Sequence, residues 1–116
     1  MKIIILLTIL LALLFQANQL VAQPGQGPGG KKPQNAETSW IKTKYLDLAY
    51  ASESPAQKLD IYLPNEGVGP FPVIISIHGG AFKFGDKADG QLTPMLEGLK
   101  HGYAVVGVNY RLSGEA

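Results

Sequence analysis

The sequence predicts an α/β fold, and three observations lead to this prediction. Two short β-branched runs, Val73–Ile77 and Ala104–Val108, are apolar on both faces, which is typical of buried strands in a parallel sheet. Between them lies a stripe of apolar residues with helical spacing. Strand, helix and strand of this length form a right-handed crossover unit, so the two runs should pair within one sheet.

The composition excludes several classes of protein. The chain has 116 residues, no cysteine and 2 histidines, so we expect neither a disulfide scaffold nor a zinc site built from Cys and His. The 10 basic side chains are balanced by 9 acidic ones, which gives no electrostatic reason to bind nucleic acid or a membrane surface. We therefore expect no nucleic-acid partner, no metal and no cofactor.

Residues 1–22 are predicted to form a signal peptide. Lys2 precedes an apolar run from Ile3 to Phe15, and the small residues Ala17 and Ala22 follow it. The run is shorter than the roughly 20 residues needed to span a bilayer. We expect cleavage near Ala22 and a secreted or periplasmic bacterial protein without stable membrane association after cleavage.

Residues 23–39 are predicted to form a linker. This segment begins with many Pro and Gly residues and has almost no large apolar side chain. Such a composition cannot bury enough surface to offset the entropy lost on ordering, so we expect disorder here. The folded domain is expected over residues 40–116.

This domain should begin with an antiparallel pair of strands. Residues 41–50 and 58–63 are compatible with strands, and the polar segment 52–57 between them supplies turn chemistry. Pro64 has no N–H group for a continuing ladder, so the second strand should end there.

A helix is expected between the two parallel strands. Gly98 should weaken this helix by about 1 kcal/mol relative to Ala, and Gly102 is placed to cap its C-terminus. The residues of the apolar stripe are Leu92, Met95, Leu96 and Leu99.

The residues after Val73–Ile77 carry the most information about function. Binding groups in open α/β sheets lie beyond the carboxyl ends of the strands, and this strand is followed by His78-Gly79-Gly80-Ala81-Phe82. A phosphate-binding loop would need a lysine where Asp86 stands, and the dinucleotide-binding glycine pattern is absent. An oxyanion hole needs only adjacent backbone N–H groups at the end of a strand, so this use fits best.

Three sequence blocks occur together in the second half of the chain: Leu59–Pro64, Pro72–Phe82 and Gly102–Leu112. In this order and spacing they resemble the amino-terminal third of α/β-hydrolase esterases and lipases with an HGG motif. That group includes hormone-sensitive-lipase-like enzymes and secreted feruloyl and acetylxylan esterases. The resemblance runs from Tyr45 to Ser113 and implies a truncated α/β-hydrolase fold, in which an antiparallel strand pair precedes a parallel β-α-β unit.

The resemblance also implies which residues act. In that family, the N–H groups of the glycine loop bind the oxyanion of the tetrahedral intermediate, which assigns this role to Gly79, Gly80 and Ala81. Gly80 and Ala81 are expected to be the direct donors, since alanine keeps its backbone N–H. Phe82 is expected to contact the substrate, a small-molecule ester, and export favours an ester of a plant polysaccharide. The residues expected to brace the loops are His78, Tyr110 and Arg111.

The family's catalytic serine is expected outside this chain. It lies in a G-x-S-x-G motif after a later strand, and none of the serines at positions 39, 52, 54, 76 and 113 lies in such a motif. We therefore interpret the chain as the N-terminal portion of a secreted carboxylic ester hydrolase that contributes the oxyanion hole and is inactive alone. The alternative is a small secreted α/β module that binds a partner or has a structural role, without catalysis.

Three features allow further interpretation. Asp86 and Asp89 can approach one cation, although a solvated loop is the simpler interpretation. Phe82, Phe84 and Tyr103 can line an aromatic acyl pocket or serve as core and rim residues. The resemblance further implies that the strand 73–77 lies beside a strand that this chain does not reach, which leaves an unpaired apolar edge.

Overall fold

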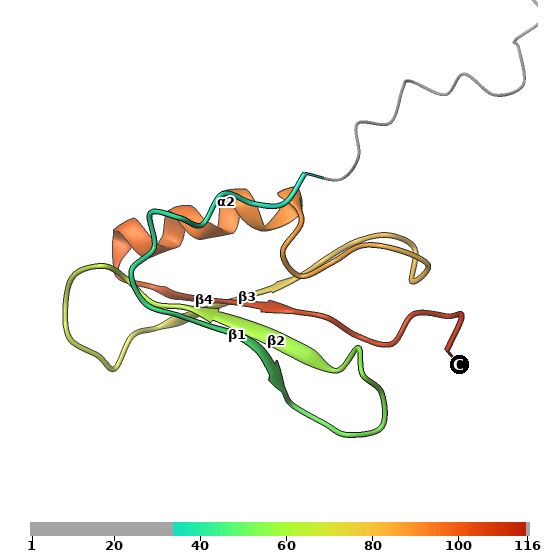
Figure 1. Ribbon diagram of the computed structural model, residues 1–116. Helices are drawn as coiled ribbons and strands as arrows, with labels where there is room; N and C mark the ends of the chain where they lie inside the picture. The colour runs from blue at the N-terminus through green and yellow to red at the C-terminus, as the bar shows by residue number, and fades with distance from the viewer. Residues whose placement is uncertain (1–33, 116) are drawn as a thin grey trace, which may run out of the picture. The chain divides into compact units, whose positions relative to one another are not determined.

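The computed structural model describes residues 34–115 (Figure 1). The expected signal peptide and most of the expected linker therefore lie outside the described residues. The strands are β1 (Lys44–Ala49), β2 (Lys58–Tyr62), β3 (Val73–Ile77) and β4 (Ala104–Val108). A helical segment joins β3 to β4 and consists of the 3₁₀ turn η2 (Gly90–Leu92), the short helix α2 (Thr93–Leu96) and the 3₁₀ turn η3 (Glu97–His101).

The four strands form one mixed sheet in the order β1-β2-β4-β3. β1 pairs antiparallel with β2, and β2 pairs antiparallel with β4, so that Asp60 lies opposite Gly107. β3 pairs parallel with β4, with Ile75 opposite Val106. The predicted antiparallel pair and parallel β-α-β unit are thus confirmed. β3 pairs with no second strand within residues 34–115, so it forms one edge of the sheet.

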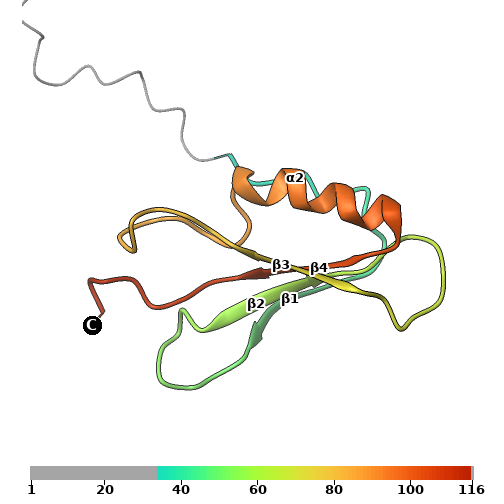
Figure 2. The same cartoon turned by 180° about the vertical axis from the view of Figure 1, so that it is seen from behind.

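The helical segment covers one face of the sheet, as the two opposite views in Figures 1 and 2 show. Three of the four residues of the predicted stripe are buried, but Met95 is 38% exposed, so its expected core position is wrong. Met95 lies in α2, between the two 3₁₀ turns that carry the buried Leu92 and Leu99. A Cβ at Gly98 would lie 2.5 Å from Cδ1 of Ile74, so this glycine lets the segment pack closely on β3.

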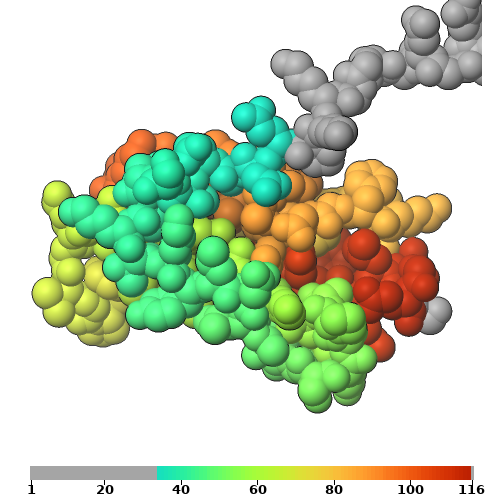
Figure 3. Space-filling view, in the orientation of Figure 1, coloured from blue at the N-terminus to red at the C-terminus, as the bar shows by residue number. Residues whose placement is uncertain are grey.

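The core lies between the helical segment and the sheet, and the chain before β1 closes it on one side. Ala36 packs against the core, and its N–H donates to the carbonyl of Ala88 at 2.8 Å. Asn35 forms an isolated β-bridge with Asp89. Residues 34–39 therefore belong to the folded unit and not to a disordered linker, and Figure 3 shows the start of the described chain lying against the helical segment. The buried core residues are Ile41, Tyr62, Leu92, Leu96, Leu99 and Val105.

The second face of the sheet carries no helix within the described residues. Val73, Ile75 and Ile77 point to this face and are 56%, 64% and 68% exposed. We call these three side chains the uncovered face. The expectation that β3 is buried on both faces is thus wrong for residues 34–115. None of the helices in the described part of the chain has the length and apolar composition required to cross a membrane.

Candidate active site

The glycine loop, residues 78–85, follows the carboxyl end of β3 and has an unusual backbone. Gly80, Ala81 and Phe82 have φ values of 137°, 52° and 59°, so three consecutive residues lie in the left-handed region. Each non-glycine residue in this region costs about 1–2 kcal/mol. Such conformations persist only where the surrounding contacts enforce them, and they cluster at functional sites.

Two glycines of the loop have no space for a side chain. A Cβ at Gly80 would lie 1.8 Å from the carbonyl oxygen of Phe84. A Cβ at Gly85 would lie 2.3 Å from Nδ1 of His78 and 2.5 Å from the carbonyl oxygen of Gly79. The loop therefore folds tightly back on itself, which explains why glycine occupies both positions.

His78 and Tyr110 brace the glycine loop from below. Nδ1–H of the buried His78 donates to the carbonyl of Gly79 at 2.9 Å, because a carbonyl can only accept. The ring of His78 stacks on Tyr110 with 4.6 Å between centroids and 14° between planes. The Tyr110 hydroxyl donates to the carbonyl of His78 at 3.0 Å. The bracing that the resemblance implied for these two residues is present in the structure.

The fixed carbonyls determine where the loop amides point. The carbonyl of Gly80 accepts the N–H groups of Lys83 at 2.9 Å and Phe84 at 3.3 Å, while His78 holds that of Gly79. In a trans peptide the C=O and the following N–H point in opposite directions, so the N–H groups of Gly80 and Ala81 point away from these contacts. Neither N–H has an acceptor within the described residues 34–115.

Unlike the N–H groups of Gly80 and Ala81, the N–H of Gly79 already has an acceptor. Its N–H donates to Oε1 of Gln91 at 2.9 Å. The expectation that Gly79 supplies an N–H to an oxyanion is therefore wrong for this structure, because a protein acceptor already occupies that donor. The bond instead fixes the start of the loop to the 3₁₀ turn η2.

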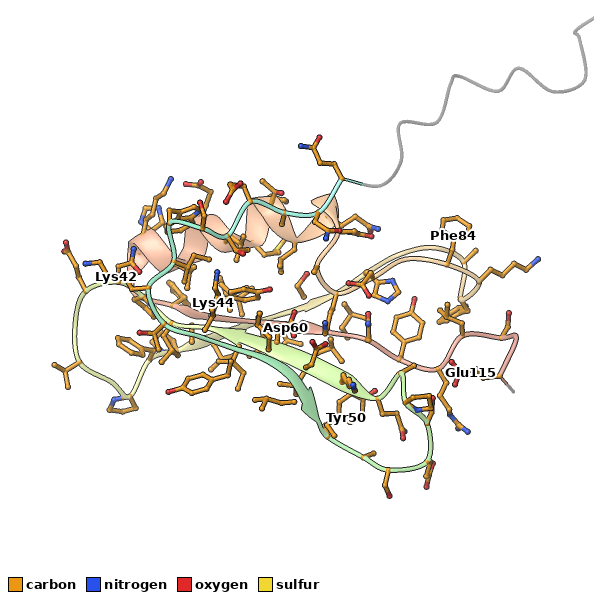
Figure 4. All side chains as sticks on the ribbon, in the orientation of Figure 1. Lys42, Lys44, Tyr50, Asp60, Phe84 and Glu115 are labelled. Atoms are coloured by element: carbon orange, nitrogen blue, oxygen red, sulfur yellow. The ribbon has the colours of Figure 1, made fainter. Side chains whose placement is uncertain are left out.

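A hollow of about 650 Å³ lies against the glycine loop and has a mainly apolar wall. The ring of Phe82 stands on its rim, 5.9 Å from that of Tyr110 in an edge-on arrangement. Phe84 extends from the tip of the loop, away from the sheet, as its label in Figure 4 shows. The residues that line the hollow are Ile77, His78, Gly79, Gly80, Ala81, Phe82, Val108, Tyr110 and Arg111.

An ion-pair cluster ties the segment after the glycine loop to β1 and β2. Nζ of Lys87 lies 3.0 Å from Oδ1 of Asp47 and 3.1 Å from Oδ2 of Asp60, and the side chains of Lys87 and Asp60 are both buried. Asp60 lies in the middle of the sheet (Figure 4). Burial alone would lower the pKa of Lys87, but the bonds to Asp47 and Asp60 outweigh it and raise the pKa above its usual value. Burial and the adjacent Asp60 raise the pKa of Tyr62, whose hydroxyl donates to Asp60.

Asn109, just after β4, adds a second tie. Its Oδ1 accepts the N–H of Lys87 at 2.7 Å, and its Nδ2 donates to Oδ2 of Asp86 at 2.9 Å. Burial acts to raise the pKa of Asp86, but the bonds from Asn109 and from the N–H of Ala88 lower it below its usual range. Asp86 is thus held as a carboxylate that orders the turn after the glycine loop.

Asp89 is buried, so the interpretation of Asp86 and Asp89 as one solvated loop is wrong for Asp89. Its Oδ1 accepts the N–H of Gln91 at 2.8 Å and caps η2, while its Oδ2 accepts from Nε2 of Gln91 at 3.1 Å. These bonds orient the amide of Gln91 toward Gly79. Within residues 34–115, no group of three or more acidic or imidazole side chains is arranged to hold a metal ion.

Gly80, Ala81 and Phe82 all line the hollow, whereas Tyr103 lies elsewhere. Tyr103 precedes the amino end of β4, and this is the end of the sheet opposite to the glycine loop. Tyr103 therefore does not line an acyl pocket with Phe82. The supporting residues that sequence reasoning missed are Gln91, Lys87, Asn109 and Asp47.

Several known proteins resemble this chain in sequence and fold. The family model BD-FAE matches residues 59–116, which is half of the chain. A solved structure described as a truncated form of a carbohydrate esterase from gut microbiota is similar with a TM-score of 0.60 and 32% identity. Esterase B from Lactobacillus rhamnosis is similar with a TM-score of 0.55 and 26% identity. A bifunctional GH43-CE protein of Bacteroides eggerthii is similar with a TM-score of 0.52 and 35% identity. No curated protein matches the chain.

The chain spans only part of these structures. The match to the carbohydrate esterase covers 72% of this chain but only 30% of the esterase. The match to esterase B covers 71% of this chain and 26% of esterase B. For the GH43-CE protein the shares are 63% and 10%. The sheet and helical segment thus correspond to part of an esterase α/β-hydrolase structure.

Proposed function

This chain belongs to the BD-FAE family, and from that premise we propose that it carries the oxyanion hole of a carboxylic ester hydrolase, formed by the N–H groups of Gly80 and Ala81. One observation carries the proposal. Both N–H groups lie beside the hollow, have no acceptor within residues 34–115, and belong to a loop whose carbonyls are fixed elsewhere. Such pre-aligned donors stabilise negative charge without reorganisation during the reaction.

The proposed chemistry is acyl transfer. A serine outside the described residues attacks the ester carbonyl carbon, and the carbonyl π electrons move onto oxygen to form a tetrahedral oxyanion. Gly80 and Ala81 donate hydrogen bonds to that oxygen, and the C=O bond re-forms as the alcohol leaves with a proton. Water then cleaves the acyl-enzyme by the same steps. Loss of one such donor typically lowers turnover about 10²- to 10³-fold.

We further propose that the substrate is an ester carried by a plant polysaccharide and that the protein acts outside the cytoplasm. The exposed ring of Phe82 on the rim of the hollow suits an acyl group with an apolar or aromatic part. The carbohydrate esterase among the similar structures supports a carbohydrate ester. The apolar run after Lys2 supports export.

The proposal is tested by titrating the ¹⁵N-labelled chain with butylphosphonate, whose anionic tetrahedral head resembles the oxyanion intermediate. We expect the amide signals of Gly80 and Ala81 to shift saturably, whereas the Gly79 signal stays nearly constant because Gln91 already accepts its proton. A parallel titration with sodium chloride controls for ionic strength. The variant Ala81→Gly keeps the N–H and should show the same response.

Unchanged Gly80 and Ala81 signals, or the same response to chloride, would show that these amides do not bind an oxyanion. Release of p-nitrophenol from p-nitrophenyl butyrate by the chain alone, far above the buffer rate, would contradict the placement of the nucleophile outside it.

A further inference from the structure

A second hollow lies at the other end of the sheet. It has a volume of about 390 Å³. We call it the Trp40 cleft; it is lined by Trp40, Asn65, Glu66, Leu99, Lys100 and Gly102.

The Trp40 cleft is separate from the glycine loop. Asn65 follows the carboxyl end of β2, and Gly102 precedes the amino end of β4. The glycine loop follows the carboxyl end of β3, and β3 runs parallel to β4. The two sites therefore lie at opposite ends of the sheet, where Figure 1 shows the loop from β2 to β3 at one end and the glycine loop at the other.

Trp40 is held in place by polar contacts on both sides. Its Nε1–H donates to the carbonyl of Glu37 at 3.1 Å, and its own carbonyl accepts from Nδ2 of Asn65 at 2.9 Å. Oδ1 of Asn65 accepts the N–H of Lys42 at 2.8 Å. Trp40 nevertheless stays 37% exposed. The cleft thus has an ordered aromatic wall, which costs little additional entropy when a ligand binds.

The chemistry of the lining favours a neutral, polar ligand with an apolar face. Lys100 places its Nζ 5.7 Å from the centroid of the Trp40 ring and 2.9 Å from Oε1 of Glu97, so the charge of Lys100 is already balanced by a residue outside the cleft. The buried Leu99 forms an apolar floor, and a Cβ at Gly102 would meet nothing within 4 Å, so this side is open. An aromatic ring has a negative face that attracts partly positive C–H groups.

A pyranose ring has these properties. Its C–H face can lie against Trp40, and its hydroxyl groups can donate to Glu66 and accept from Lys100. We propose that the Trp40 cleft binds a sugar unit of a neutral polysaccharide at a site separate from the glycine loop. The choice of a polysaccharide rests on the proposed function, whereas the choice of a pyranose rests on the lining of the cleft.

Trp40 is the only tryptophan of the chain, so its fluorescence reports directly on this cleft. The experiment titrates the full chain with xylotetraose and with cellotetraose and records tryptophan emission. We expect a saturable change in emission with at least one of the two sugars. Glu66→Ala should weaken this binding about tenfold through loss of a charge-assisted hydrogen bond. Glu53→Ala is the matched control, because Glu53 is an exposed glutamate outside the cleft, and it should leave the affinity unchanged.

No change in emission with either sugar, or equal weakening by Glu66→Ala and Glu53→Ala, overturns the proposal. Calorimetry on Trp40→Phe and Trp40→Ala gives a second measurement, in which Phe should retain part of the binding and Ala should lose it. Retained binding in a folded Trp40→Ala variant also overturns it. The butylphosphonate titration of Gly80 and Ala81 is independent, so failure at one site is distinguishable from failure at the other.

Discussion

The glycine loop depends on single glycines whose backbone conformation other amino acids rarely adopt. Gly80 has both a left-handed φ of 137° and a carbonyl oxygen where its Cβ would stand. Gly102 has a φ of 81° but open space, and Gly114 has neither constraint. Comparing these three glycines therefore distinguishes the free-energy cost of backbone strain from that of a steric clash.

We predict a graded loss of stability when each glycine is changed to alanine. Gly114→Ala should change the free energy of unfolding by less than about 0.5 kcal/mol. Gly102→Ala should lower it by about 1–2 kcal/mol through backbone strain alone. Gly80→Ala should cost clearly more, since the loop must also move. Urea denaturation of the three variants measures the series, and equal losses for Gly80 and Gly102 would argue against the tight turn.

Sequence reasoning led to the proposed donors Gly80 and Ala81 but not to the residues that hold the glycine loop in place. Gly80 and Ala81 could be proposed from the sequence because an oxyanion needs adjacent N–H groups, which a glycine-rich motif after a strand can supply. Gln91 was not predictable, since its partner is the backbone of Gly79 and a glutamine in a turn gives no signal of that contact. Asp47 was missed because its left-handed conformation, at φ 56°, belongs to an irregularity of β1 that turn propensities do not reveal.

At the scale of elements, local patterns predicted the strands better than the connections between them. β3 and β4 lie where the β-branched runs predicted them, because strand formation follows from short-range composition. The position of β4 between β2 and β3 depends on contacts distant in sequence, so periodicity could not reveal it. The helical segment lies where the stripe predicted it, with Leu92, Leu96 and Leu99 buried but Met95 partly exposed.

The ion pairs of Lys87 connect these elements, and we predict that Lys87→Met destabilises the chain strongly. The change leaves Asp60 buried without its cation, and breaking a buried ion pair typically costs about 3–5 kcal/mol. Lys100→Met is the matched control, because Lys100 pairs with Glu97 on the surface and should cost less than about 1 kcal/mol. Similar urea midpoints for the two variants would show that the buried pair contributes little.

At the scale of the whole molecule, the uncovered face lies next to the edge strand β3 in the described part of the chain. Exposed apolar side chains beside unpaired backbone groups favour association between chains. We predict that the chain self-associates at increasing concentration and that Ile75→Lys reduces this association. Val68→Lys, at a residue 95% exposed in the loop before β3, should leave it unchanged.

Sedimentation velocity over a range of concentrations measures the effect. Ile75→Lys should lower the weight-average sedimentation coefficient at high concentration toward that of a single chain. A wild-type chain that stays monomeric throughout, or a variant that associates as strongly, would contradict the prediction.

Because the proposed donors at Gly80 and Ala81 are main-chain N–H groups, their binding of an oxyanion should depend little on pH. Histidine and lysine donors lose a proton within or near the range in which enzymes work, but a peptide N–H does not titrate there. The affinity of this loop for an oxyanion should therefore be constant from weak acid to weak base. Any bell-shaped dependence of the assembled hydrolase on pH would then arise in the groups that move protons to and from the serine and the leaving alcohol.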